Sequence, residues 1–252
     1  MGSLRCGKFM NRAKPKWEAC FLIVQQKKSC EAVFCRKGSE QIIYEKCEGI
    51  PYMCGRYYVD DDTAKEIEKL AGQVDEKMRQ GTGVSLQAKD IHPSEMAPIL
   101  TADAKGLCCR WQRWGFPGFG GKQLLFNARS ESALEKKTFR ESVQQRRIVV
   151  PATWFYEWNK KKEKNIFYRQ GQPVLYMAGL YNRYQEEERF VILTTEANAS
   201  MRPVHDRMPL VLEPDEILQW LSEDQLAEAF LQKTPPLLER RAEYEQMNLF
   251  LV

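Results

Sequence analysis

The clearest helical periodicity in the chain lies in the segment that follows Asp61. Apolar side chains recur there every three or four residues: Ile67, Leu70, Ala71, Val74 and Met78. This spacing is typical of a helix with one buried face. Thr63 and Glu66 have the spacing of a capping box at its start, and Gly81 marks its end.

From residue 107 onward, short runs of aromatic, β-branched and aliphatic residues are separated by turn residues, a pattern typical of strands. The predicted strands are residues 107–111, 124–126, 148–150, 154–158, 166–169, 174–178 and 190–195. The charged residues 159–164 are predicted to form the tip of a hairpin.

A short strand at residues 210–212 is followed by a helix opened by Pro214 and by another from Ser222, whose spacing to Gln225 is that of a capping box. Strands dominate the middle of the chain and helices flank them, without regular alternation of the two. We therefore predict an α+β fold with a mostly antiparallel, barrel-like β core and flanking helices.

Charge and cysteine are concentrated at the start of the chain. The net charge is +4, but residues 1–52 hold 10 Lys and Arg against 5 Asp and Glu, which leaves 28 against 29 in the remainder. Binding of nucleic acid by the main body must therefore come from local patches. The eight cysteines form no Cys-x-x-Cys pair and the chain has two histidines, so we expect neither a metal nor a cofactor. Cys108 and Cys109 are interpreted as small buried hydrophobic residues.

Residues 1–52 are interpreted as an N-terminal extension. Glu48 and Gly49 would be encoded by purine-rich codons that can contain a bacterial ribosome-binding element, three codons before Met53. We expect a mis-assigned start or a translated leader, with Met53 as the first residue of the domain. The alternative is a genuine N-terminal segment, such as a cleaved propeptide.

Five short motifs follow in order after residue 52. They are Met53-Cys54-Gly55-Arg56, Arg113-Trp114-Gly115-Phe116-Pro117, Asn127-Ala128-Arg129-Ser130-Glu131, Phe155-Tyr156-Glu157-Trp158 and His205-Asp206-Arg207-Met208-Pro209. In this order they resemble the motifs of the SRAP family, the SOS-response-associated peptidases, over residues 53 to about 222. The resemblance implies an SRAP domain at residues 53–252 and the SRAP fold.

The resemblance also implies covalent capture of abasic sites in single-stranded DNA. The amine of an N-terminal Cys54 would form a Schiff base with the aldehyde of the open sugar, and its thiol would close a thiazolidine ring. The α-amine has a reference pKa of about 7.7–8.0 and the thiol one of about 8.5, so both have a reactive form near neutral pH. An internal cysteine lacks the free amine, so we expect removal of Met53. Asn127 matches the residue that positions the cysteine and contacts DNA.

Two further catalytic roles come from the same resemblance. Glu157 matches a proton shuttle that acts in Schiff-base formation and in reversal of the crosslink, and His205 matches the active-site histidine, which Asp206 would orient. Alternation along a strand places Glu157 on the opposite face from Tyr156 and Trp158. The alternatives are a surface carboxylate in an ion pair for Glu157 and a purely structural role for His205.

Arg56, Arg129 and Arg207 are the candidates for contact with DNA phosphates, because guanidinium groups suit phosphate oxygens. Each could instead be the partner of an internal ion pair. Family members often carry tryptophans that wedge or stack at the lesion, and here Phe119 stands in that place with a smaller ring. Trp114 is interpreted as a core residue.

The expected partner is therefore single-stranded DNA with abasic sites, bound by a monomer without metal. No apolar run approaches the length needed to span a bilayer, and the N-terminus lacks the apolar stretch of a secretory signal. We therefore expect a cytoplasmic bacterial protein, found at the nucleoid when bound to DNA. Two other functions stay open: a cysteine-type, self-processing peptidase that uses Cys54, His205 and Glu157, and a single-strand-binding module without catalysis.

Overall fold

A computed structural model describes residues 30–37, 40–47, 55–70, 73–74, 88–104, 106–118 and 123–242. The chain divides into two compact units, Met1–Ile50 and Pro51–Val252. In the first unit, β1 (Cys30–Lys37) pairs antiparallel with β2 (Glu40–Cys47). The sequence did not predict this hairpin, because its first 52 residues show little periodicity.

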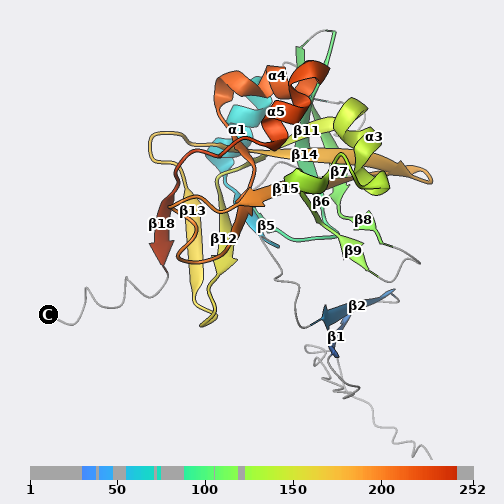
Figure 1. The fold of residues 1–252 in the computed structure, drawn as a ribbon, viewed down its shortest axis with the longest axis vertical. Helices are drawn as coiled ribbons and strands as arrows, with labels where there is room; N and C mark the ends of the chain where they lie inside the picture. The colour runs from blue at the N-terminus through green and yellow to red at the C-terminus, as the bar shows by residue number, and fades with distance from the viewer. Residues whose placement is uncertain are drawn as a thin grey trace, which may run out of the picture. The chain divides into compact units, whose positions relative to one another are not determined.

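A closed five-stranded barrel forms the centre of the second unit (Figure 1). In order around the ring, its strands are β15 (Glu187–Glu196), β14 (Leu175–Tyr184), β11 (Arg147–Ala152), β6 (Met96–Asp103) and β7 (Gly106–Trp114). Neighbouring strands pair antiparallel, except that β15 and β7 pair in parallel and close the ring. The predicted barrel-like core is confirmed.

Shorter strands extend this sheet beyond the ring. They are β4 (Gln73–Val74) beside β7, β10 (Asn127–Arg129) and β16 (Arg207–Pro209) beside β15, and β17 (Val211–Leu212) beside β14. Strand β15 therefore pairs with four others, and two of these, β10 and β16, carry predicted site residues.

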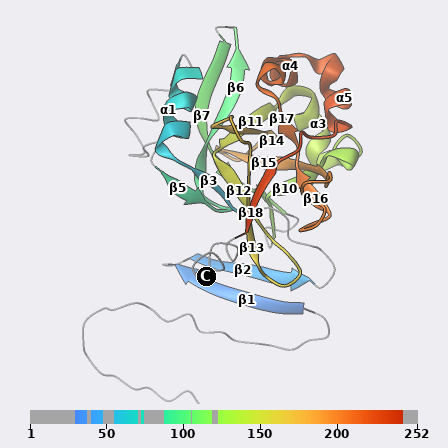
Figure 2. The same ribbon diagram turned by 90° about the vertical axis from the view of Figure 1, so that its left-hand side faces the viewer.

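A second, antiparallel sheet carries the predicted site residue Glu157. Its order is β18 (Glu239–Ala242), β13 (Lys164–Tyr168), β12 (Trp154–Trp158), β3 (Tyr57–Val59) and β5 (Lys89–Ile91). The hairpin between β12 and β13 confirms the predicted tip, and it projects from the described part of the second unit (Figure 2). A separate pair joins β8 (Phe116–Pro117) to β9 (Leu124–Leu125).

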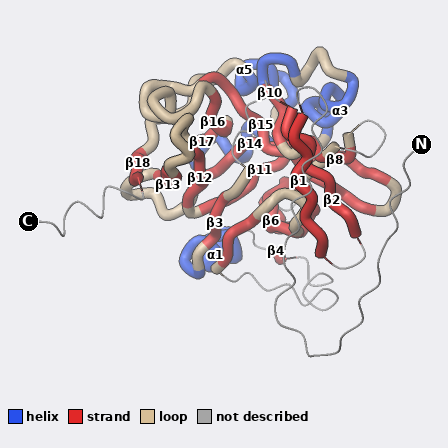
Figure 3. The backbone as a smooth tube through the Cα atoms, turned by 90° about the horizontal axis from the view of Figure 1, so that it is seen from below, coloured by secondary structure: helices blue, strands red, loops and turns tan. Residues whose placement is uncertain are grey.

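Four short helices lie at the periphery of the strands in the described residues (Figure 3). They are α1 (Asp61–Leu70), α3 (Lys137–Gln145), α4 (Ile217–Ser222) and α5 (Ala227–Leu231). Together with the barrel they confirm the predicted α+β class with flanking helices.

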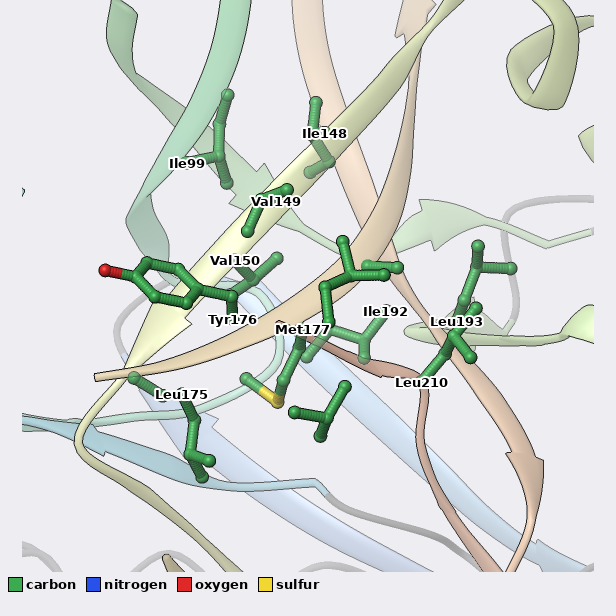
Figure 4. Close-up of a cluster of buried hydrophobic side chains, with 14 of the residues drawn as sticks. Ile99, Ile148, Val149, Val150, Leu175, Tyr176, Met177, Ile192, Leu193 and Leu210 are labelled. Atoms are coloured by element: carbon green, nitrogen blue, oxygen red, sulfur yellow. The ribbon is translucent and has the colours of Figure 1, made fainter. Parts of the chain in front are cut away.

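The interior is packed mainly with aliphatic side chains, most of which come from successive barrel strands. Figure 4 shows Ile99, Ile148, Val149, Val150, Leu175, Tyr176, Met177, Ile192, Leu193 and Leu210. Burial of each large aliphatic side chain contributes about 1.5–3 kcal/mol. Gly179 marks a close approach of strands, since a Cβ atom there would lie 2.8 Å from the Val191 carbonyl oxygen. The buried Trp114 and the buried Cys108 and Cys109 are core residues, as predicted.

Helix α1 is shorter than the apolar spacing predicts. It ends at Leu70, and Gln73–Val74 pair in parallel with Cys108 and Cys109 as strand β4. The predicted helix is therefore wrong at residues 73–74, and its remaining predicted positions, Ala71, Met78 and Gly81, lie outside the described residues. The physical reason is tertiary: pairing with the edge of β7 satisfies the backbone of residues 73–74 in place of helical hydrogen bonds.

The predicted capping boxes are also wrong. Asp60 caps α1, because its Oδ1 accepts the Thr63 N–H at 2.7 Å. Thr63 itself is buried, and its hydroxyl lies 2.8 Å from that of Thr153. The capping box near the C-terminal helices joins Glu213 and Glu216, with Glu216 Oε2 accepting the Glu213 N–H at 2.7 Å. The predicted box from Ser222 to Gln225 is absent from the described helix ends.

Arg147 ties two helix ends to the barrel. Its side chain is 2% exposed and donates to the carbonyl oxygens of Val143 and Gln144 at 2.8 and 2.9 Å, at the end of α3. It also donates to the Trp220 carbonyl in α4 at 2.5 Å and to Asp224 Oδ1 at 2.7 Å. A buried cation at two helix C-termini satisfies carbonyl groups that lack helical partners.

Candidate active site

The segment of Gly55 and Arg56 lies between two of the predicted site segments. A Cβ atom on Gly55 would be 3.8 Å from the ring of Phe126. The carbonyl oxygen of Arg56 accepts the N–H of Tyr156 at 3.0 Å. The backbone of residues 55–56 is thus held between β12 and the loop that precedes β10.

Asn127 and Glu157 directly follow these two contacts in the sequence. The structure therefore gathers three of the predicted motifs, those that begin at residues 53, 127 and 155. Cys54, the predicted nucleophile, lies outside the described residues, as does Phe119.

Glu157 is a buried carboxylate with an exposed fraction of 3%. It shares one face of β12 with Phe155, while Trp158 on the other face is 37% exposed. Its Oε1 accepts the Trp158 N–H at 3.1 Å, and the buried Asn165 lies opposite it in register on β13. Burial argues against a surface ion pair, since a buried charge needs polar partners.

Asn127 and Arg129 are placed by β10, which runs parallel to β15. Asn127 is half-buried, whereas Arg129 is exposed. Within the described residues, the Arg129 guanidinium takes part in no ion pair, so its charge faces solvent. The Trp114 indole N–H donates to the Phe126 carbonyl at 2.8 Å, which anchors the start of this strand to the core.

His205 precedes β16 and is held by the backbone. Its Nδ1 accepts the Arg207 N–H at 3.0 Å, so the neutral ring carries its proton on Nε2. Burial is the largest influence on the pKa of His205 and lowers it from its ordinary value, although the charge of Asp206 opposes this. The Asp206 carboxylate lies 3.0 Å from the same Nδ1 and is 75% exposed. Because Nδ1 is an acceptor in the neutral ring, the Arg207 backbone rather than Asp206 orients His205 in that state.

Arg207 forms an internal ion pair. Its two terminal nitrogens donate to the two oxygens of Glu131 at 2.6 and 2.8 Å, and one also donates to the Thr194 carbonyl at 2.8 Å. Burial alone would raise the pKa of Glu131, but the hydrogen bonds and charge of Arg207 outweigh it and hold the pKa below its ordinary value. This geometry favours the internal-pair alternative for Arg207.

Arg56 is also paired. Its guanidinium forms an ion pair with Asp90 and lies 5.1 Å from the centre of the Tyr156 ring. Burial alone would raise the pKa of Asp90, but hydrogen bonds from Arg56 and Tyr156 outweigh it and lower the pKa. Since Tyr156 and Glu157 alternate along β12, the Arg56 guanidinium lies on the opposite face from the Glu157 carboxylate.

Sequence reasoning assigned no role to Glu131 or Asn165. Glu131 lies in the same motif as Arg129 and carries a negative charge, so it could have been proposed from the sequence as the ion-pair partner of Arg207. Asn165 could have been found from the hairpin register, which sets it opposite Glu157. In the described ranges, no group of three or more His, Cys, Asp or Glu residues could hold a metal ion. No helix in those ranges is long and apolar enough to span a bilayer.

Comparison with known families gives one match that covers most of the chain. Residues 53–250 match SRAP, described as "SOS response associated peptidase (SRAP)". The chain is 34% identical over 181 residues to the abasic site processing protein YedK of Escherichia coli (strain K12), covering 68% of this chain and 81% of that protein. It is 30% identical over 190 residues to the abasic site processing protein YoqW of Bacillus subtilis (strain 168), covering 68% and 80%.

A solved structure has the same fold. The crystal structure of a protein from Bacteroides thetaiotaomicron superposes with a TM-score of 0.64 and 24% sequence identity, covering 75% of this chain and 91% of that one. At this identity the likeness concerns the fold alone.

Proposed function

This chain belongs to the SRAP family, and we propose that it captures abasic sites in single-stranded DNA as a covalent adduct of Cys54. The observation that carries the proposal is the buried carboxylate of Glu157 beside the segment of residues 55–56, to which Cys54 is bonded. The names of the relatives YedK and YoqW, abasic site processing proteins, support the same substrate.

The proposed reaction is a condensation. The free amine of Cys54 adds to the aldehyde carbon of the open abasic sugar, and loss of one water gives a Schiff base. The thiol sulfur then bonds to that carbon while the nitrogen takes up the proton, which closes a thiazolidine ring. Glu157 gives a proton to the departing hydroxyl, which leaves as water, and in the reverse reaction its carboxylate takes a proton from the water that adds to the Schiff base.

The other site residues position the strand and the reacting groups. Burial lowers the pKa of His205 and so favours the neutral ring, which acts as a hydrogen-bond donor through Nε2. Arg129 binds a phosphate, because its guanidinium is exposed and charged. Arg56 and Arg207 keep their carboxylate partners and hold the walls of the site in place.

The chemistry requires that Cys54 be the first residue of the active protein. With residues 1–53 attached, its nitrogen is an amide whose lone pair is delocalised into the carbonyl group. The thiol alone forms only a reversible hemithioacetal with an aldehyde. We therefore propose that residues 1–52 are absent from the active form or are removed from it, and that Met53 is then removed.

The test compares full-length protein with protein that begins at Cys54, each with its N-terminus verified by mass spectrometry. Both are incubated with three single strands: an abasic strand, an intact strand and a strand carrying tetrahydrofuran, which lacks the aldehyde. Denaturing gels should show an adduct only for the Cys54 form with the abasic strand. Cys54→Ser should abolish the heat-stable adduct, since the corresponding oxazolidine ring hydrolyses more readily.

Three other outcomes would contradict the proposal. Equal yields from verified, unprocessed full-length protein would remove the requirement for a free amine. Self-cleavage without crosslinking would favour the peptidase alternative, in which the Cys54 thiol attacks an amide. Retention of strands on native gels alone would favour a binding module without catalysis.

A further inference from the structure

Most of the described arginines are neutralised by neighbouring carboxylates. More than half of the arginines with described side chains form ion pairs, among them Arg56, Arg113, Arg147, Arg169, Arg189 and Arg207. The tip of the β12–β13 hairpin differs. Lys160, Lys161 and Lys162 are consecutive and exposed, and none of them forms an ion pair within the described residues.

The backbone of this tip is held by Asn159. Its Oδ1 accepts the N–H groups of Lys161 and Glu163 at 2.9 and 3.0 Å, and its carbonyl oxygen accepts the N–H of Lys162 at 2.8 Å. Lys162 has a φ of 64°, in the left-handed region that non-glycine residues adopt rarely. The turn is therefore ordered by its own hydrogen bonds, and it carries three exposed lysines on consecutive residues.

The tip's acidic residue does not neutralise these lysines. Glu163 Oε2 accepts a hydrogen bond from the Asn159 side-chain amide at 2.6 Å, which turns the carboxylate toward the base of the loop. Like charges on three neighbouring residues repel one another, so the arrangement gains most from a polyanionic ligand.

The tip also lies close to the proposed reaction site. Lys160 is three residues after Glu157, a distance of at most about 11 Å along the chain. Trp158, between them, is 37% exposed, and Lys164 lies opposite it in register. The loop extends beyond the ends of the neighbouring strands in Figures 1 and 2. An exposed aromatic ring beside unneutralised cations is the combination that binds single strands, where rings stack on bases and cations meet phosphates.

Resting on the proposed single-strand function, we propose that Lys160, Lys161 and Lys162 bind the phosphate backbone of the strand as it leaves the reaction site. Each phosphate contact contributes about 0.7 to the slope of log affinity against log salt on single strands, so three contacts contribute about 2. A variant without them should lose that part of the slope. The ratio of the unmodified protein's affinity to the variant's affinity for a single strand should therefore fall roughly 20-fold between about 50 mM and about 200 mM salt.

The experiment measures noncovalent binding of intact single strands, which carry no aldehyde, across a salt series. The test variant carries Lys160→Gln, Lys161→Gln and Lys162→Gln, and glutamine keeps the side-chain bulk at the left-handed position. A second variant carries arginine at the same three positions. The matched control carries Lys65→Gln, Lys69→Gln and Arg110→Gln, which remove the same net charge from α1 and β7.

Strand length gives a second readout. Strands of about 4 and about 20 nucleotides bracket the usual range of single-strand sites, and only the longer one should reach the tip. We expect the glutamine variant to lose a slope of about 2 on the long strand alone. The arginine variant should bind like the unmodified protein, and the α1 and β7 control should keep its slope.

Four results would overturn the inference: an unchanged slope, an equal loss in the control variant, an equal loss on the short strand, or the same loss in the arginine variant. A loss of binding to polyglutamate with unchanged strand binding would instead identify an acidic peptide as the ligand and would also overturn it. The crosslinking yield of unmodified Cys54-initiated protein separates this failure from failure of the proposed function. Normal crosslinking with an unchanged slope rejects only the lysine tip, whereas strand binding without crosslinking rejects only the covalent function.

Discussion

Glu131→Gln removes the negative charge that holds Arg207 while keeping the shape of the side chain. In the structure, both Glu131 oxygens accept hydrogen bonds from the guanidinium, at 2.6 and 2.8 Å. Hydrogen bonds to charged groups are worth about 1.5–3 kcal/mol. The Glu131 side chain is 38% exposed, so screening by water reduces this figure, and we expect a loss of about 1–2 kcal/mol in the free energy of unfolding. For a domain of this size that corresponds to a decrease in Tm of about 2–8 °C.

The pH dependence of this loss follows from the lowered pKa of Glu131. A carboxyl group with a depressed pKa in the folded state stabilises the protein above its unfolded pKa, about 4.3 for glutamate. That stabilisation is lost as the pH falls through the folded pKa. The difference in unfolding free energy between unmodified protein and Glu131→Gln should therefore be constant from about pH 6 to pH 8 and should close below about pH 4.

Urea unfolding at a series of pH values measures this difference directly. Glu135→Gln is the matched control, because Glu135 is exposed nearby and its carboxylate forms no ion pair within the described residues. A difference for Glu131→Gln below about 0.5 kcal/mol, the range of ordinary surface changes, would refute the stabilising pair. A difference that persists in acid, or an equal one in the control, would do the same.

The other predictions concern separate features of the fold and the site. Arg147→Met should lower the free energy of unfolding by about 3–5 kcal/mol, because it leaves helix-end carbonyls buried without a donor. Asp224→Asn should lower it by less than about 1 kcal/mol, because Asp224 is the exposed end of the same pair. Urea midpoints measure both losses, and equal losses would contradict the role of Arg147 at the helix ends. Glu157→Gln should slow crosslinking or its reversal without changing strand affinity, and unchanged rates in both directions across pH would remove Glu157 from the mechanism. Arg129→Ala should reduce the salt slope on single strands by about 0.7; an unchanged slope with lost thermal stability would indicate a structural role. Burial raises the pKa of Cys109 to about 12, so alkylating reagents at about pH 8 should modify it only after unfolding, and rapid modification of the native protein would show the burial to be wrong.

The parts of the fold that follow local rules could be predicted from the sequence. Alternation along β12 correctly set Glu157 on the face opposite Trp158, and the charged loop was recognised as a hairpin tip. Strand β6 was missed because it contains Pro98, a residue that usually excludes a strand interior. The end of α1 was missed because the apolar spacing alone does not reveal that the edge of β7 is available for pairing.

Long-range pairing decided what the sequence left open in the site. Arg207 had two possible partners, a phosphate or an internal carboxylate, and the carboxylate of Glu131 lies 76 positions away in the chain. The parallel contact of β15 with β7 joins Phe190 to Trp114 and has no local signature. Cys54 and Phe119 lie outside the described residues, so their roles stay predictions.

The four-way pairing of β15 has a consequence for the order in which the parts of the proposed site come together. The strands that it joins extend from residue 106 to residue 209, and pairing over such separations makes folding slow because long loops must close first. During synthesis Cys54 emerges early. Strand β16, with Arg207 and the backbone that holds His205, emerges more than 150 residues later. Under the proposed function, a nascent or truncated chain would carry the proposed nucleophile without the groups proposed to assist it, and the crosslinking yield would then report how many molecules have completed their fold.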